Sequence, residues 1–196
     1  MSTARIPTTE ITGVYGALAK RISRKKLGGV PESLGVMWHN LPVMKAFFSF
    51  SAKASRWEAC DPSLKSFAHM AVAARVGCSF CLDLGYFEAH NKRLDLAKAR
   101  EVPRWRESSL FTPLERDVLE YAEAATETPS AVTDELAERL LSALGAPALL
   151  ELTAYVGFAN LTSRTNAALG IASEGLAASC GLRPLAQPSG AVLSTT

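Results

Sequence analysis

Four glycines stand at the ends of long stretches whose apolar residues recur at intervals of three and four. They are Gly28, Gly77, Gly145 and Gly170. This period is typical of amphipathic helices, and glycine readily adopts the left-handed conformation that ends a helix. No run of strict apolar and polar alternation is long enough to predict a strand. The sequence therefore predicts an all-α protein.

The stretch between Asp61 and Gly77 carries the clearest pair of helix signals. Asp61 is suited to accept hydrogen bonds from the first amides of a helix, and Pro62 is favoured at the first helical position. Gly77 is expected to end this helix, and a second helix to begin at or just before Cys78. The core stripe of the first helix is expected to contain Leu64, Phe67, Ala68, Ala71, Val72 and the aliphatic stem of Arg75.

Further helix starts depend on threonine. Thr112 is followed three residues later by Glu115, which predicts a capping box. Thr133 opens the next amphipathic stretch in the same way. Near the beginning of the chain, Thr8 or Thr9 is expected to cap a first helix.

The length and composition suit one core. The chain has 196 residues, of which 48% are hydrophobic and 20% charged, so it can bury one sizeable core as a single helical domain. We expect residues 1–59 to form an N-terminal helical extension that packs on a helical core over residues 60–180. The charged residues 100–109 are expected to form a connector. Residues 181–196 are rich in Pro, Ser and Thr and are predicted to be a disordered tail.

The charge balance argues against several partners. The chain has 21 Lys and Arg against 19 Asp and Glu, and its longest basic run extends only from Arg24 to Lys26. Binding to nucleic acid or to a membrane is therefore not predicted. No apolar run reaches the roughly 18 residues of a membrane span, and no leader pattern is visible, so we expect a soluble, cytoplasmic protein.

The cysteines are too few for the disulfide framework of a secreted scaffold. They are Cys60, Cys78, Cys81 and Cys180. Cys78 and Cys81 are three positions apart where a helix is expected to begin, so they can form a disulfide with little backbone movement. The positive end of the helix dipole lowers a thiol pKa and favours Cys78 as the more acidic of the two. Asp83 would oppose ionisation if it pointed at the sulfurs, but it can equally face solvent.

The C-x-x-C spacing also occurs in proteins where it has no redox role. A structural or incidental pair stays open, because isolated C-x-x-C spacings occur by chance. A zinc site is disfavoured, since there is no second C-x-x-C and His69, His90 and Cys60 have no recognised ligand spacing. Covalent haem attachment requires histidine where Leu82 stands. We therefore expect neither a metal nor another cofactor.

The motif HMAVAARVGCSFCLDLG, followed by TPLERDVLEYAEAATETPSAVTDEL and ELTAYVGFANLTSR, resembles the carboxymuconolactone decarboxylase and alkylhydroperoxidase D superfamily over residues 60–175. The resemblance implies an all-helical core that assembles as dimers, trimers or hexamers. In the redox branch it also implies a peroxidase or disulfide reductase in which Cys81 attacks the hydroperoxide and Cys78 resolves the product. The helix dipole favours Cys78 instead, so the two arguments disagree on the attacking sulfur.

The chain departs from the pattern of this redox branch at the proton relay. The histidine that follows the second cysteine by four is replaced by Gly85, and the glutamate twelve residues before the first cysteine is replaced by Ser66. Phe80 stands where some members carry another histidine. His69, on the preceding helix, is the best substitute base, although a lone histidine on an apolar face is more often a core residue. Asn160 and Arg164, His39 and His90, and the aromatic residues Trp57, Tyr86 and Trp105 are expected to be structural or surface residues.

Three functions remain open. The first is a thiol-dependent peroxidase or disulfide oxidoreductase that uses Cys78, Cys81 and His69, a hydroperoxide substrate and an external dithiol, thioredoxin-like or lipoyl reductant. The second is a non-catalytic helical oligomer or binding protein that has kept the cysteines. The third is a carboxymuconolactone decarboxylase-like enzyme, for which Arg75 and Arg164 are the only candidate carboxylate ligands.

Overall fold

The computed structural model describes residues 4–189 and confirms the all-α fold, since these residues form no strand. In chain order the elements are α1 (Gly13–Leu27), α2 (Glu32–Met37), α3 (Leu41–Ala54), α4 (Pro62–Val76), α5 (Ser79–Asn91), α6 (Leu96–Glu101), the 3-10 helix η1 (Val102–Glu107), α7 (Pro113–Ala124), α8 (Asp134–Leu144), α9 (Ala146–Ala168) and α10 (Leu176–Ser179).

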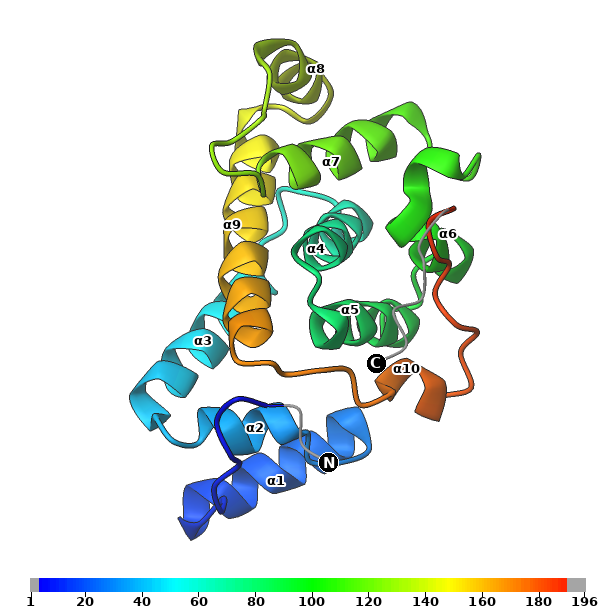
Figure 1. Cartoon of the computed structure of the whole chain (residues 1–196). Helices are drawn as coiled ribbons and strands as arrows, with labels where there is room; N and C mark the ends of the chain where they lie inside the picture. Colours follow the sequence, from blue (N-terminus) through cyan, green and yellow to red (C-terminus); the bar gives the residue numbers. More distant parts are fainter. Residues whose placement is uncertain (1–3, 190–196) are drawn as a thin grey trace.

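Helix α4 lies at the centre of the molecule, with α9, α7, α5 and η1 packed around it (Figure 1). Its small residues Ala68, Ala71 and Ala73 are fully buried and permit the close approach of neighbouring helices. Phe67 and Met70 fill the remaining space. A helix that is buried on most of its circumference can place side chains against several partners at once, including α5 and its cysteines.

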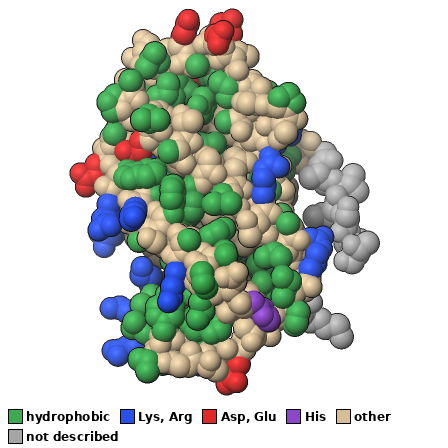
Figure 2. All heavy atoms as spheres, turned by 90° about the vertical axis from the view of Figure 1, so that its left-hand side faces the viewer, with side chains coloured by type: hydrophobic (Ala, Val, Ile, Leu, Met, Phe, Trp, Pro, Cys, Tyr) green, Lys and Arg blue, Asp and Glu red, His purple; other side chains and the backbone are tan. Residues whose placement is uncertain are grey.

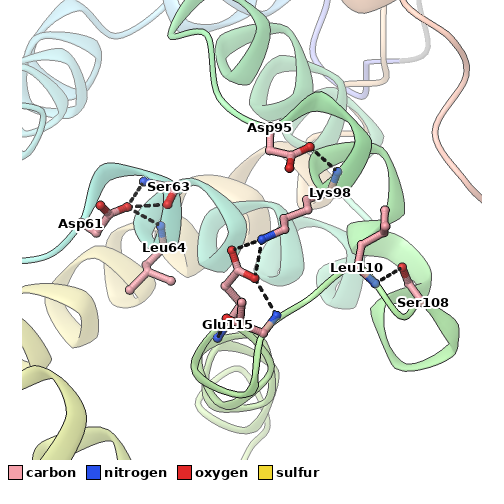
Figure 3. Close-up of polar contacts among 9 residues, drawn as sticks. Asp61, Ser63, Leu64, Asp95, Lys98, Ser108, Leu110 and Glu115 are labelled. Atoms are coloured by element: carbon pink, nitrogen blue, oxygen red, sulfur yellow. Dashed lines mark hydrogen bonds and ion pairs between the residues drawn. The ribbon is translucent and has the colours of Figure 1, made fainter.

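The predicted helix ends around this core are confirmed. The carboxylate of Asp61 accepts hydrogen bonds from the amides of Ser63 and Leu64 at 2.7 and 3.4 Å (Figure 3). Thr112 and Glu115 form the predicted capping box. Each carboxylate oxygen of Glu115 also accepts a hydrogen bond from Lys98 Nζ at 2.8 Å, which ties α6 to α7 (Figure 3).

Two predictions from the sequence, one for α1 and one for α4, are wrong. Helix α1 begins at Gly13 rather than after Thr8 or Thr9, because the amide of Thr9 donates to the carbonyl of Gly35 on α2 at 3.2 Å. Arg75 does not contribute to the core stripe of α4. Its guanidinium is exposed and pairs with Glu127 at 2.5 Å.

The predicted connector at residues 100–109 contains the end of α6 and the whole of η1. Trp105 anchors this segment: its ring is buried, and Nε1 donates to Glu123 on α7 at 2.9 Å. Arg106 and Glu107 are exposed, whereas Glu101 is buried and pairs with Arg100 and Arg104.

Helices α1, α2 and α3 form a layer beside α5 and the lower end of α9 (Figure 1). The layer has its own small apolar cluster, made of Ile11, Leu34, Trp38 and Met44. At the other end of the chain, residues 182–189 form no helix but are held against α6 and η1. The Ala186 amide donates to the Arg100 carbonyl at 3.0 Å, and Ser189 Oγ to Glu107 at 2.7 Å. The predicted disordered tail is therefore bound to the core up to Ser189, and its remainder, residues 190–196, lies outside the described residues.

Of the helices described, none combines the length and the apolar character that a membrane crossing requires.

Candidate active site

Cys78 and Cys81 form a disulfide at the start of α5, with their Cα atoms 5.3 Å apart. The local cause is Gly77, which adopts φ +77° and turns the chain from α4 directly into α5. Cys78 is thereby the N-cap residue, and its Sγ accepts a hydrogen bond from the amide of Cys81 at 3.2 Å. The structure brings the two sulfurs together, as their spacing predicts.

Both sulfurs are sealed from solvent. Cys78 is 1% exposed and Cys81 is 3% exposed. The apolar side chains packed around them come from α2, α5 and the segment that follows α9, and include Val36, Phe80, Phe87, Ile171 and Leu176. A redox role requires reagents to reach the sulfurs, so this apolar cover must open or admit small molecules.

Asn166 is a site residue that was not predicted from the sequence. It lies near the end of α9, and its Nδ2 donates to Cys81 Sγ at 3.3 Å. Both groups are buried. The sequence signal was weak: Asn166 is an amide in the final turns of a helix rich in small and apolar residues, and nothing in the sequence indicates which cysteine it faces.

The orientation of Asp83, which the sequence left open, is resolved. Its carboxylate accepts hydrogen bonds from Ser173 Oγ at 2.7 Å and from the amides of Leu176 and Ala177 at 2.8 and 2.9 Å. Asp83 is thus directed at the start of α10, where it replaces the missing intrahelical partners of the first amides. Its buried carboxylate anchors the cover of the disulfide.

His69 lies on α4 beside Gly85, which is one helical turn beyond Cys81. A Cβ atom at Gly85 would be 2.8 Å from Met70 Cγ and 3.5 Å from His69 Nδ1, so the glycine makes room for both side chains. Burial lowers the pKa of His69, while the charge of Glu88 raises it and that of Lys92 lowers it further. The imidazole is therefore neutral at pH 7. Among the described residues it forms no hydrogen bond to either sulfur.

The other candidates have structural or surface positions. Asn160 donates to Thr126 Oγ1 at 2.9 Å, and Arg164 donates to the Thr126 carbonyl and to Asn160. His39 Nε2 lies 2.8 Å from the Pro7 carbonyl, and His90 is exposed.

The remaining two cysteines have different environments. Cys60 is buried, and desolvation raises the pKa of its thiol to about 11. Cys180 is exposed. Within residues 4–189, no three His, Cys, Asp or Glu side chains converge in a way that would hold a metal ion.

The segment that carries this site is similar in sequence to known proteins. Residues 42–124 match the Carboxymuconolactone decarboxylase family, a segment that runs from the second residue of α3 to the end of α7 and contains both site cysteines. The protein YnjA of Escherichia coli strain K12 is 40% identical over 116 residues, which is 59% of this chain and 64% of YnjA. The match therefore spans less than two thirds of that relative's length.

Three solved structures share the fold. The debrominase Bmp8 superposes with a TM-score of 0.76 at 20% identity, over 91% of this chain and 97% of Bmp8. A peroxidase-related protein from Ralstonia eutropha JMP134 with an alkylhydroperoxidase AhpD core gives 0.77 at 16% identity, over 90% and 95% of the two chains. A peroxidase-related protein from Silicibacter sp. TM1040 gives 0.70 at 20% identity, over 87% and 94%. Likeness at these identities establishes the fold.

Proposed function

We propose that the chain is a thiol-dependent oxidoreductase that reduces organic hydroperoxides, because residues 42–124 match the Carboxymuconolactone decarboxylase family and the chain carries a C-x-x-C disulfide. The observation that carries the proposal is the disulfide at the start of α5, where a helix N-terminus and two amide donors surround the sulfurs. Such surroundings stabilise thiolates, the reactive form of cysteine.

The proposed cycle moves two electrons from an external dithiol to the hydroperoxide. The dithiol attacks the Cys78–Cys81 disulfide, closes its own disulfide and leaves both cysteines reduced. The thiolate of Cys81 then attacks the terminal oxygen of the hydroperoxide, the O–O bond breaks, and the alkoxide leaves as the alcohol after taking up a proton. Cys78 attacks the resulting sulfenic acid, which re-forms the disulfide and releases water.

His69 is the proposed base that receives the thiol proton. Its low pKa keeps the imidazole neutral, which is the form that accepts a proton, but also makes it a weak base. In the closed structure it lies beside Gly85 and does not contact the sulfurs, so proton transfer would need a small movement or an intervening water molecule. Turnover slower than that of enzymes with a histidine on α5 is expected.

The surroundings of the disulfide favour particular partners. The cover is apolar, which suits an organic hydroperoxide better than a charged oxidant. A reductant must reach sulfurs that are at most 3% exposed, so a flexible lipoyl arm or a thioredoxin-like protein requires the cover to open. Since such dithiol systems operate in reducing compartments, a cytoplasmic location is part of the proposal.

Stopped-flow consumption of cumene hydroperoxide with dihydrolipoamide tests this function. Cys81→Ser should abolish consumption. Reduced Cys78→Ser, mixed with the hydroperoxide after the dithiol has been removed, should consume one equivalent and stop at the sulfenic acid of Cys81. Cys180→Ser is the matched control, because it removes an exposed thiol outside the pair and should leave the rate unchanged. A Cys81→Ser variant as fast as the unmodified protein would remove the proposal.

The same reaction mixtures distinguish the competing functions. A non-catalytic helical protein would keep both thiols free after exposure to peroxide, as measured by thiol titration. Release of bromide from 2,3,4-tribromopyrrole would instead indicate an activity related to the one for which Bmp8 is named. A decarboxylase role is the weakest alternative, because Arg75 and Arg164 are engaged by Glu127 and by the Thr126 carbonyl.

We also propose that the protein is a homo-oligomer. A shallow groove between α3 and α9 is lined by apolar side chains and contains no charged residue: Ala46, Phe47, Phe50, Ala154, Gly157, Phe158 and Leu161. Figure 2 shows hydrophobic side chains gathered on this side of the molecule. Surfaces of this kind are typical of contacts between proteins, and a second copy of the chain is the proposed occupant.

A further inference from the structure

We propose that Asn166 stabilises the thiolate of Cys81 and thereby makes Cys81, rather than Cys78, the attacking sulfur. The carboxamide of Asn166 reaches from the end of α9 and donates to Cys81 Sγ at 3.3 Å, in a place where both residues are buried. This role deepens the proposed thiol chemistry and rests on it, but it can be measured without any turnover.

A buried thiolate needs a donor because it has lost its hydration. Cys60 shows the effect of burial within the same chain: it is 1% exposed, and desolvation raises the pKa of its thiol to about 11. Cys81 is 3% exposed and would behave similarly if its surroundings were only apolar. A hydrogen bond to the charged form lowers the pKa again.

The two sulfurs of the pair obtain their donors in different ways. Cys78 Sγ faces the amide of Cys81, a backbone group that is present whatever side chains surround it. Cys81 Sγ instead accepts a hydrogen bond from a side chain, the carboxamide of Asn166. The nearby carboxylates are turned to other partners, Asp83 to α10 and Glu174 to the amide of Glu32. His69 on α4 is neutral, so the stabilisation proposed for Cys81 comes from a neutral donor.

The turn of α9 that carries Asn166 is fastened by the N-terminal segment. The Arg5 amide donates to the Leu169 carbonyl at 2.7 Å, and its guanidinium donates to the carbonyls of Ala167 and Ala168. A cation at the carboxyl end of a helix satisfies its free carbonyls and complements its dipole. The segment before α1 therefore helps to fix the position of the donor.

The pH dependence of thiolate absorbance at 240 nm tests the proposal, since no reagent has to enter the cover. A Cys78→Ser, Cys180→Ser background leaves Cys81 as the only thiol that titrates below the range of Cys60. Serine at position 78 retains a side chain that can cap α5. Asn166→Leu, which is close in size, should raise the pKa of Cys81 by about one to two units. Asn166→Ser, whose side chain is too short to reach the sulfur, should also raise the pKa of Cys81.

Two controls separate this role from general damage to α9. Asn160→Leu removes an amide of the same kind from the same helix, where it binds Thr126, and should leave the pKa of Cys81 within about 0.3 unit. In a Cys81→Ser, Cys180→Ser background, Asn166→Leu should leave the pKa of Cys78 equally unchanged.

An unchanged Cys81 pKa in folded Asn166→Leu and Asn166→Ser variants would overturn the proposal, and so would equal shifts at Cys78 and Cys81. These results are independent of the proposed function. A protein that consumes no hydroperoxide but shows the Cys81 shift would refute the peroxidase activity and support the role of Asn166. A protein that turns over hydroperoxide without the shift would support the peroxidase activity and refute the role of Asn166.

Discussion

The least expected residues in the core are Lys65 and Glu151, which form a buried ion pair between α4 and α9. Nζ and Oε1 are 2.5 Å apart, and the two side chains are only 8% and 9% exposed. Lys65 also donates to the Trp57 carbonyl at 2.6 Å, and Glu151 accepts from the Ala59 amide at 2.8 Å. The pair thus joins the connector after α3 to the two central helices.

Lys65→Met should lower the free energy of unfolding by about 3–5 kcal/mol, because it leaves the Glu151 carboxylate buried without its cation. The double variant Lys65→Met, Glu151→Leu should recover most of this loss. Urea denaturation measures both. Lys92→Met, at the half-exposed pair with Glu88, is the control and should cost less than about 1 kcal/mol. Equal losses for Lys65→Met and Lys92→Met would contradict the buried role of Lys65.

The Lys65–Glu151 pair also makes the free energy of unfolding depend on pH, in a direction that follows from the pKa of Glu151. Burial alone would raise the pKa of Glu151, but the hydrogen bonds from Lys65 and the amides of Ala59 and Cys60 hold it below its usual value of 4.5. A depressed carboxyl pKa stabilises the fold above pH 4.5, and this contribution is lost as the pH falls through the folded-state pKa. Between about pH 5 and pH 3 the unmodified protein should therefore lose more unfolding free energy than the double variant. Parallel curves would show that the pair does not contribute.

At the scale of single residues, the sequence predicted what depends on near neighbours. Asp61 and Thr112 cap the helices that follow them, and Cys78 and Cys81 meet, because each of these contacts spans three residues or fewer. Asn166 and Cys81 are 85 positions apart, and Lys65 and Glu151 are 86 apart. Periodicity can place such residues on a helix, but the packing of the helices decides which of them touch.

Among the elements, α10 and the segment before it contribute apolar side chains to the cover of the disulfide and are tied to α5 by hydrogen bonds. Asp83 accepts three hydrogen bonds from this segment, and Ser79 Oγ accepts a fourth from the Ser173 amide at 3.1 Å. Asp83→Ala should lower the free energy of unfolding by about 2–4 kcal/mol and speed reduction of the disulfide by dithiothreitol at least about tenfold. Asp95→Ala removes a comparable cap from α6 and should cost about 1 kcal/mol without changing the reduction rate. If both variants were reduced at the same rate, α10 would not be the cover.

Whether a helix could be predicted from the sequence depended on its length. The helices that became α4, α7 and α8 were predicted from their caps and apolar period, and α9 from the length of its stretch and Gly170 at its end; each has eleven residues or more. The short helices α2, α6, η1 and α10, which have four to six residues, were not predicted. Helices of one or two turns show too little periodicity to be recognised and depend on tertiary contacts such as that of Trp105 with Glu123.

At the scale of the whole molecule, the apolar groove between α3 and α9 is exposed on the surface of a single copy of the chain. Phe50 stacks on Phe158 with ring centroids 4.6 Å apart, which joins α3 to α9, yet Phe50 remains 40% exposed and Leu161 51% exposed. Gly157 also lines this groove, and an added Cβ there would have nothing within 4 Å. A close approach by a second helix is therefore sterically open at Gly157.

A charge placed in this groove should prevent assembly without disturbing the core. Leu161→Glu changes a side chain that is already half exposed, and in an oligomer it would bury an unpaired carboxylate. Light scattering on a sizing column should give a multiple of 20.9 kDa for the unmodified chain and 20.9 kDa for Leu161→Glu. Leu141→Glu, 47% exposed on α8 at the far end of the molecule (Figure 1), should keep the mass of the unmodified protein. A monomeric unmodified chain, or an oligomer that tolerates Leu161→Glu, would mean that this face has another partner.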